Sequence, residues 1–341
     1  MIEETVFTKE KIIETIKIIY NIDVYQIEKL NRGSANLYSL NDNKYVLKEF
    51  QTKYTKEEIE KEIIIINHLK NDNIPVPEYI RTLNGDYSFM YEQRVVTMQK
   101  YIDGYTMESN TGTPDQVLES AEYLGKIIKS LETLNIELPS NDVSSWYSNE
   151  TINESIEKQE KLLEKITIES YPQIYKDLTD KISMLKYVRD NLDFRDMDKL
   201  TVMNTHGDYS VLQFIYKEEK INAIIDFVSA CKMPIVWEII RSYSYIDPLA
   251  KEGKIDINNL VKYVEKVNEY VKLNKYDLKY MSYLYLVQLL ASTFGYKQYI
   301  TDNSKTSLLD FAYFRTRMCR FLFENAEKIA KTLEEELANV N

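Results

Sequence analysis

The chain has 341 residues, of which 44% are hydrophobic and 28% charged, with 8 Gly and 7 Pro. This balance is typical of a folded globular protein with two domains or two lobes, and it excludes a disordered or low-complexity chain. The net charge of −11 comes without a block of basic residues, so no partner nucleic acid is expected. The acidity favours solubility and, more weakly, a cationic substrate.

The cysteines and the apolar segments bear on where the protein works. Cys231 and Cys319 lie far apart and match no metal or redox spacing, which favours a reducing cytoplasm. The first twenty residues carry several charges and do not form a signal peptide. The longest uncharged run, residues 280–296, is shorter than the roughly 20 residues of a membrane span. We therefore expect a cytoplasmic protein without a membrane partner.

The first fifty residues predict a helix and then an antiparallel meander. Residues 8–20 place isoleucines on one face behind a possible N-cap at Thr8, as an amphipathic helix does. Asn41-Asp42-Asn43 has the composition of a hairpin turn. Alternating apolar and polar residues predict three strands, at residues 23–30, 37–40 and 44–50.

The break between the first two strands contains small residues, Ser34, Ala35 and Asn36. Their backbone N–H groups could lie against phosphates. A plain surface hairpin would have the same composition, so the loop alone does not indicate a nucleotide site.

Lys48 lies on the third strand between apolar neighbours. Alternation sends Val46, Lys48 and Phe50 to one face, and a buried lysine there needs an anionic partner, such as a phosphate or a helix carboxylate. A solvent-facing lysine is the alternative. The next segment, residues 55–69, predicts a helix with a capping box and an isoleucine stripe. Glu62 lies beside that stripe and could pair with Lys48, with Glu58 as the competing candidate.

Two more strands are predicted at residues 79–83 and 88–96, joined by the turn Asn84-Gly85-Asp86. They complete a five-stranded antiparallel sheet with one helix packed on it. The segment from residue 97 to 104 then leaves the sheet, and a connector of this kind can offer backbone N–H and C=O groups to an adenine edge. We place the first lobe at 1–98, the hinge at 99–104 and the second lobe at 105–341.

The second lobe is predicted to be mostly helical. A helix starts at Thr113-Pro114 and runs to Leu134, with Leu118 on its apolar face. Two charge-laced helices, at residues 151–168 and 171–192, look like the exposed helices of an insertion. The remaining helices are predicted near residues 234–246, 256–272, 276–298 and 306–337.

Two acidic residues lie at the ends of short apolar segments inside this lobe. Asp208 follows Thr205-His206-Gly207, and Asp226 follows Ile224-Ile225. The pattern predicts strand, tight loop, strand, turn, strand, with both carboxylates facing one cleft. Phosphoryl transfer uses such a pair, because one carboxylate orients the acceptor hydroxyl. The second, with an amide or carboxylate a few residues after the first, holds Mg²⁺ on the nucleotide phosphates.

The order of these motifs resembles the aminoglycoside phosphotransferase and choline/homoserine kinase group, the small-molecule branch of the protein-kinase-like fold. His206-Gly207-Asp208 with Gln213, and Ile225-Asp226-Phe227, carry the resemblance, which covers roughly residues 25–245. It implies an α+β fold of two lobes, a small antiparallel sheet lobe and a larger, mostly helical lobe. It also implies transfer of the γ-phosphate of ATP to a hydroxyl of a small molecule, such as an aminoglycoside, homoserine, choline or a sugar.

The resemblance further implies roles on the nucleotide side. Lys48 would contact the α/β-phosphates, held by Glu62. Ser34, Ala35 and Asn36 would cover the phosphates, and the backbone from Gln99 to Tyr101 would hold the adenine.

At the reacting end, the resemblance makes Asp208 the catalytic base or orienting carboxylate. Asp226 would be the main Mg²⁺ ligand, with Gln213 beside it. His206 would brace the catalytic loop through its ring. A further expectation is that the acceptor site is lined by residues of the segment after Asp226, with Glu238, Arg241 and Asp247 as candidates.

One departure from the family pattern bears on activity. Gln213 stands where the family has Asn, and Tyr209-Ser210-Val211-Leu212 replaces a common His-Pro-Gly. The carboxamide oxygen remains available to a hard cation, but the extra methylene moves it by about one bond length. The alternative hypothesis is therefore a degenerate kinase-fold protein with a binding or spore-coat role.

Overall fold

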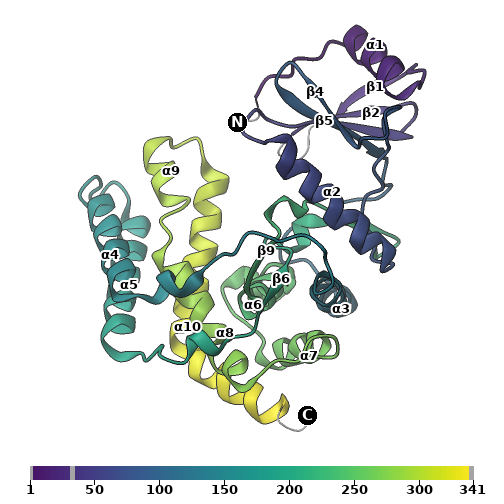
Figure 1. Ribbon diagram of the computed structural model, residues 1–341. Coiled ribbons are helices and arrows are strands. Elements are labelled where there is room, and N and C mark those ends of the chain that lie inside the picture. Colours follow the sequence, from purple (N-terminus) through teal and green to yellow (C-terminus); the bar gives the residue numbers. More distant parts are fainter. Residues whose placement is uncertain (1–2, 31–34, 338–341) are drawn as a thin grey trace. The chain divides into compact units, whose positions relative to one another are not determined.

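The computed structural model describes residues 3–30 and 35–337. The chain divides into two compact units (Figure 1). The first comprises Met1–Thr106, Thr133–Glu137 and Gln213–Ala230, and the second Met107–Glu132, Leu138–Leu212 and Cys231–Asn341. The hairpin that follows Asp208 in the sequence thus groups with the N-terminal sheet, whereas a boundary at residue 104 places it in the helical lobe.

The first unit is built on a five-stranded antiparallel sheet of order β1-β2-β3-β5-β4. Asn41, Asp42 and Asn43 all have positive φ and form the predicted turn between β2 and β3. The strands are β1 (Ile27–Leu30), β2 (Asn36–Leu40), β3 (Tyr45–Glu49), β4 (Ser88–Tyr91) and β5 (Arg94–Lys100).

The number of strands agrees with the prediction, but two assignments were wrong. The predicted strand at residues 79–83 makes only an isolated bridge, from Tyr79 to Gln99. The single strand predicted at 88–96 is instead a hairpin, β4 and β5, which turns at Glu92 and Gln93. Both turn residues have positive φ, the geometry of a primed two-residue turn, although neither is the Asn or Gly that usually marks one.

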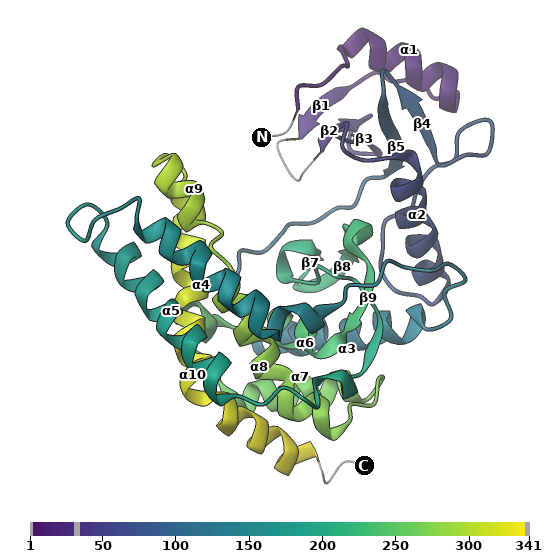
Figure 2. The same ribbon diagram turned by 60° about the vertical axis from the view of Figure 1, so that its left-hand side comes forward.

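Helix α1 (Lys9–Tyr20) covers one face of this sheet (Figure 2). Its Ile12, Ile16 and Tyr20 pack with Leu47 and Met98 of the sheet in one buried cluster. Helix α2 (Lys56–Asn71) begins with the predicted capping box of Thr55 and Glu58. A second hairpin, β7 (Phe214–Lys217) and β8 (Lys220–Ile224), is tied to the same unit through backbone hydrogen bonds of Tyr105 with Tyr216 and of Ile224 with Pro75.

The second unit is mostly helical and carries one strand pair, β6 (Val202–Thr205) with β9 (Cys231–Pro234). The predicted helix at 276–298 ends early and restarts after Gly295, so it forms two helices. Leu118, predicted to be buried, is 37% exposed. The helices are α3 (Pro114–Leu131), α4 (Asn149–Leu163), α5 (Pro172–Asn191), α6 (Ile235–Ile246), α7 (Ile257–Asn268), α8 (Lys275–Ala291), α9 (Tyr296–Thr301) and α10 (Thr306–Leu337).

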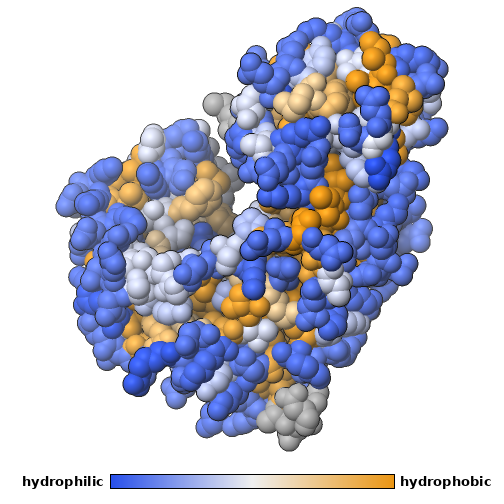
Figure 3. Space-filling model, in the orientation of Figure 1, coloured by the Kyte–Doolittle hydropathy of each residue, from blue (hydrophilic) through white to orange (hydrophobic). Residues whose placement is uncertain are grey.

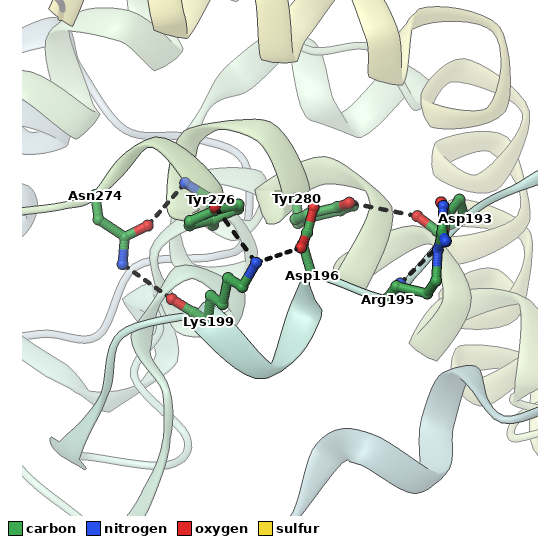
Figure 4. Close-up of polar contacts among 7 residues, drawn as sticks. All are labelled: Asp193, Arg195, Asp196, Lys199, Asn274, Tyr276 and Tyr280. Atoms are coloured by element: carbon green, nitrogen blue, oxygen red, sulfur yellow. Dashed lines mark hydrogen bonds and ion pairs between the residues drawn. The ribbon is translucent and has the colours of Figure 1, made fainter.

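The segment that leads into β6 is fixed to the start of α8 (Figure 4). Asn274, the N-cap of α8, donates its side-chain N–H to the Lys199 carbonyl at 3.0 Å. The backbone N–H of Thr201, one residue before β6, donates to Asp277 Oδ1 at 2.8 Å. These contacts set the position from which the strand enters the loop that carries Asp208.

Hydrophilic side chains cover most of the face drawn in Figure 3, in line with the net charge of −11. Among the described residues, no helix has the length and apolar character to cross a bilayer.

Candidate active site

The loop that carries Asp208 follows β6 in the second unit. Gly207 at its turn has a φ of +79°, a conformation that favours glycine. The backbone N–H of Asp208 donates to Nδ1 of the buried His206 at 3.3 Å, which confirms that this histidine braces the loop. The Asp208 side chain is 40% exposed, whereas His206 and Tyr209 are fully buried. The loop therefore presents one accessible carboxylate between buried anchors.

Glu238 of α6 bonds both ends of this loop. Its carboxylate is fully buried and accepts the Tyr209 N–H on Oε1 at 2.8 Å and the Thr205 hydroxyl on Oε2. Since Thr205 precedes the turn and Tyr209 follows it, a single side chain closes the loop. The prediction that Glu238 lines an acceptor site is therefore wrong, because both of its carboxylate oxygens are already bonded to the loop.

Arg241 lies one turn further along α6 and contacts the candidate catalytic residue itself. Its Nη2 donates to Asp208 Oδ1 at 2.5 Å, and its Nη1 donates to the Tyr209 carbonyl at 3.3 Å. The guanidinium is held by the rings of Trp237 and Tyr245, whose centroids lie 5.2 and 4.9 Å away. Two residues of one helix, Glu238 and Arg241, thus fix the backbone and the side chain of the catalytic loop.

Asp226 and Gln213 lie together at the end of the β7–β8 hairpin in the first unit. Phe214 pairs with Ile224, so Gln213 stands opposite Ile225, whose N–H donates to the Gln213 carbonyl at 3.0 Å. Asp226 follows with φ 68° and ψ 58°, a left-handed conformation that is unusual for a residue other than glycine. The hairpin register therefore brings the backbones of Gln213 and Asp226 close together, and the meeting of their side chains at one Mg²⁺ stays a prediction.

Glu62 of α2 reaches the same neighbourhood, through Tyr79. Burial raises the pKa of the Tyr79 hydroxyl well above its usual value, and the negative charges of Glu62 and Asp226 raise it further. Glu62 itself is buried, with 2% of its surface exposed. The charges of Glu62 and of the candidate metal ligand Asp226 thus both act on one buried phenol, a proximity that no motif in the sequence predicts.

Lys48 lies on the sheet face opposite α1. Its neighbour Leu47 packs in the α1 cluster, so strand alternation directs Lys48 to the other face. Its Nζ lies 4.4 Å from the centroid of the Phe50 ring, which confirms that residues 48 and 50 share a face. The ion pair of Lys48 with Glu62 stays a prediction.

The expectations for the phosphate loop are met only in part. Ser34 lies outside the described residues. Asn36 is the first residue of β2, and its buried side chain donates to the Glu3 carbonyl at 3.0 Å, so this amide faces the N-terminal segment. Ala35 is also buried, with 3% of its surface exposed. A contact of these two residues with phosphate therefore stays a prediction for their backbone alone.

The adenine-binding prediction needs a correction at Tyr101. The Tyr101 N–H donates to the Lys44 carbonyl at 3.1 Å, and the Lys100 N–H donates to the Glu78 carbonyl at 2.8 Å. These two donors are used within the sheet, so a contact of the Tyr101 backbone with adenine would need its carbonyl and stays a prediction. Gln99 lies in β5 opposite Val46, still within the sheet, and its contact with adenine stays a prediction.

The oxygen donors of Gln213 and Asp226 fit Mg²⁺ better than a metal that needs a closed protein cage. Within residues 3–30 and 35–337, no three His, Cys, Asp or Glu side chains converge into a complete metal site. Mg²⁺ commonly takes one or two protein oxygens and completes its shell with phosphate oxygens and water. A carboxylate at Asp226 and an amide at Gln213 are the ligand types that meet that requirement, and their joint binding of Mg²⁺ stays a prediction.

The residues that support the site were mostly missed from the sequence. The sequence pattern places Glu238 and Arg241 at the acceptor site, whereas the structure shows them bonded to the loop that carries Asp208. A signal was present for Glu238, because it interrupts an apolar run, Pro234-Ile235-Val236-Trp237, and a buried glutamate there needs hydrogen-bond donors.

Comparisons with known proteins identify the family and the fold. Residues 26–255 match the family model described as "Phosphotransferase enzyme family". A homoserine kinase from Zymomonas mobilis subsp. mobilis is 21% identical over 222 residues, a match that covers 64% of each chain. The chain thus spans just under two thirds of the length of this curated relative.

Solved structures show the same fold at low sequence identity. A spectinomycin phosphotransferase in complex with ADP and spectinomycin has a TM-score of 0.62 at 18% identity, over 97% of this chain and 100% of that one. A microcompartment-associated aminopropanol kinase has a TM-score of 0.59 at 14% identity, over 94% and 100% of the two chains.

These likenesses confirm the predicted α+β, protein-kinase-like fold, with a small antiparallel sheet and a larger helical part. The family match covers well over half of the chain, including the Lys48 strand, the Asp208 loop and the Asp226 hairpin. The chain therefore belongs to the phosphotransferase enzyme family.

Proposed function

We propose that this protein is an ATP-dependent kinase that transfers the γ-phosphate to a hydroxyl group of a small molecule. The observation that carries the proposal is the catalytic loop. Asp208 is accessible and in contact with Arg241, while His206 and Tyr209 are buried and Tyr209 is bonded to α6 and α3. A carboxylate held in this way can orient a hydroxyl without moving during the reaction.

In the proposed reaction, the acceptor hydroxyl oxygen attacks the γ-phosphorus, and the bond from that phosphorus to the bridging oxygen of ADP breaks. The hydroxyl proton passes to Asp208. Arg241 acts as a positioning residue, because it fixes Oδ1 of that carboxylate. When bound, Mg²⁺ would neutralise charge on the phosphates, with Asp226 and Gln213 as its protein ligands.

The nucleotide would lie along the first unit. Lys48 would contact the α/β-phosphates and pair with Glu62, and the backbone of residues 34–36 would lie against the phosphates. The segment from Gln99 to Tyr101 would border the adenine through groups other than the Tyr101 N–H. Structures of family relatives with ADP, AMP and AMP-PNP support a nucleotide cofactor.

For the acceptor, we infer a hydroxylated amine. The relatives named for spectinomycin, aminopropanol and homoserine all act on molecules that carry both hydroxyl and amino groups. The net charge of −11 also favours a cationic substrate. A screen of amino alcohols, amino sugars and neutral sugars by ADP release would identify the acceptor.

The decisive experiment compares two aspartates of the second unit. Asp208→Asn should lower the rate of phosphoryl transfer by about 10³-fold or more, as the loss of a base and an orienting group does, and change nucleotide affinity by less than about threefold. Asp193→Asn is the matched control, since Asp193 also pairs with an arginine, Arg195, at 2.6 Å but on an exposed segment. Full turnover in Asp208→Asn would refute the role of Asp208.

A further inference from the structure

A cavity of about 270 Å³ lies in the second unit at the C-terminal end of α6. It is bounded by the first turns of α3, the segment that follows α6, and α7. The residues that matter for its chemistry are Val117, Leu118, Asp247, Leu249, Asn259 and Lys262.

The walls of this cavity are apolar side chains that remain accessible. Leu118 and Leu249 are 37% and 48% exposed, although leucine is among the residues most often buried in a core. Leu118 lies on the stripe of α3 that periodicity predicts to be buried, and the cavity explains why it is not. Apolar walls of this kind suit the aliphatic part of a small ligand.

Asp247 supplies a polar anchor. Only 4% of its surface is exposed, and its Oδ2 has no hydrogen-bond partner among the residues that the structure describes. The nearby Tyr243 hydroxyl donates to the Asp256 carbonyl at 3.1 Å. Burial raises the pKa of the Asp247 carboxyl; the Tyr243 hydroxyl and the backbone N–H groups of Ala250 and Leu249 oppose this rise, and the charge of Asp256 adds to it. A buried carboxylate oxygen without a donor is costly, and a ligand donor would remove that cost.

The backbone around the cavity is held in place by hydrogen bonds. The Asn110 side chain donates to the carbonyls of Ser244 and Asp247 at 2.8 and 3.0 Å, and the Gly112 N–H donates to the Ile246 carbonyl at 3.0 Å. A Cβ at Gly112 would lie 2.9 Å from that carbonyl, so this close approach requires glycine. The cavity is therefore formed without a ligand, which lowers the cost of binding.

We propose that this cavity binds a small molecule with an ammonium group on a short aliphatic body, the ammonium bonded to Asp247 Oδ2. Asn259 and Lys262 also line the cavity and offer an amide and a cation to a second, anionic group. An aliphatic α-amino acid carries both charges and would bind more tightly than the simple amine.

This site is separate from the candidate active site. Asp247 is the C-cap of α6 and follows Arg241 by six positions. At 1.5 Å per residue, the two backbones lie about 9 Å apart along the helix axis. Binding at Asp247 therefore needs no phosphoryl transfer, and failure of one proposal leaves the other untouched.

The test is calorimetric titration of the full chain with three probes of one carbon skeleton: leucine, 3-methylbutylamine and 4-methylpentanoate. We expect the amine to bind with a Kd on the order of 1 mM, leucine more tightly, and the acid more than tenfold more weakly than the amine. In Asp247→Asn, amine affinity should fall at least tenfold. Equal binding of the acid and the amine would overturn the proposal, and so would the absence of binding by both leucine and the amine.

A second variant guards against misfolding of Asp247→Asn. Leu118→Trp fills the cavity from the exposed surface of α3 and leaves the carboxylate in place. It should abolish binding of leucine and the amine, whereas Ile13→Trp, at a 45% exposed position of α1, should leave both affinities unchanged. Unchanged affinity in Leu118→Trp would place the binding site elsewhere.

Discussion

Each compact unit contains a glutamate with no exposed surface, and their partners differ. Glu49 of the first unit accepts from Arg94 at 2.7 Å, from the Thr5 hydroxyl at 2.5 Å and from the Val6 N–H at 3.1 Å. Glu238 of the second unit has neutral donors as its hydrogen-bonding partners, the Thr205 hydroxyl and the Tyr209 N–H. The first carboxylate balances a buried cation, while the second holds a peptide loop.

This difference separates a residue that maintains the fold from one that maintains the site. Glu49 lies beside Lys48 on β3 but faces the opposite side of the sheet, toward the N-terminal segment. Its loss should destabilise the protein without a specific effect on chemistry. Glu238 bonds both ends of the Asp208 loop, so its loss should act on the position of the catalytic carboxylate.

The largest effect on stability is expected when glutamine replaces each of the two glutamates in turn and the two free energies of unfolding are compared. Glu49→Gln leaves the Arg94 guanidinium, which is 8% exposed, with only the partly exposed Glu3 carboxylate, at 3.4 Å, as its counter-charge, and should lower the free energy of unfolding by roughly 3 kcal/mol. Glu238→Gln can still accept the Tyr209 N–H with its amide oxygen and offer its NH₂ to Thr205, so it should cost less than about 1.5 kcal/mol. Urea unfolding of both variants measures the difference, and equal costs would refute this comparison.

The next effect concerns Arg241, which joins α6 to the catalytic carboxylate. Arg241→Met removes the contacts to Asp208 Oδ1 and the Tyr209 carbonyl and should lower kcat about 100-fold, with the KM for nucleotide within about threefold. Arg241→Lys should recover little of this loss, because an ammonium cannot reproduce the two-pronged contact. Arg195→Met, in an exposed pair with Asp193, is the matched control and should leave kcat unchanged. If Arg241→Met raised the KM for nucleotide and left kcat unchanged, the positioning role of Arg241 would be contradicted.

A third buried charge tests whether any buried charge of the second unit affects kcat, or only those that support the Asp208 loop. Lys181 of α5 is 2% exposed, and its Nζ donates to the Ser292 carbonyl at 2.5 Å. Burial lowers its pKa from the ordinary 10.5 to about 8. Between these two values the unfolded chain binds the proton and the folded chain does not, so the contribution to stability rises with pH.

The free energy of unfolding of the natural protein, minus that of Lys181→Met, should therefore increase from pH 8 to pH 9.5. The slope should be at most about 1.4 kcal/mol per pH unit. Subtracting the variant removes the contributions of the tyrosines and other lysines. Because Lys181 lies on α5, outside the loop and its supports, kcat should not change. A flat difference across this range would show that Lys181 keeps its ordinary pKa.

The parts of the fold that were predictable are set by local sequence. The capping boxes of Thr55 with Glu58 and of Thr113 with Gln116 each lie within four residues, and both are present. The hairpin at Glu92 and Gln93 was missed because its left-handed turn residues are neither Asn nor Gly, while Asn84-Gly85-Asp86 nearby gave a stronger turn signal.

The same division holds for the candidate site. His206-Gly207-Asp208 and Ile225-Asp226-Phe227 are contiguous, so their chemistry can be inferred from their order in the sequence. The supports are not contiguous: Glu238 bonds residues 29 and 33 positions away, and the Tyr101 N–H is used by Lys44 across the sheet. Such roles follow from tertiary packing and strand register, which no short pattern specifies.

The smallest effect, and the sharpest test of whether the two regions work as one enzyme, is expected at Gln213. Its carbonyl accepts the Ile225 N–H at 3.0 Å whichever amide side chain is present, so Gln213→Asn should leave the hairpin intact and only draw the amide oxygen back by about one bond length.

In an active kinase adapted to glutamine, that shift should lower kcat a few-fold and raise the Mg²⁺ concentration needed for half-maximal rate. In a degenerate kinase-fold protein, restoring the family's asparagine should instead raise turnover tenfold or more from a very low level. ADP release across a Mg²⁺ titration distinguishes these outcomes, and because Asn and Gln differ by one methylene, a large gain would place the defect in the metal ligand, not in the Asp208 loop that α6 supports.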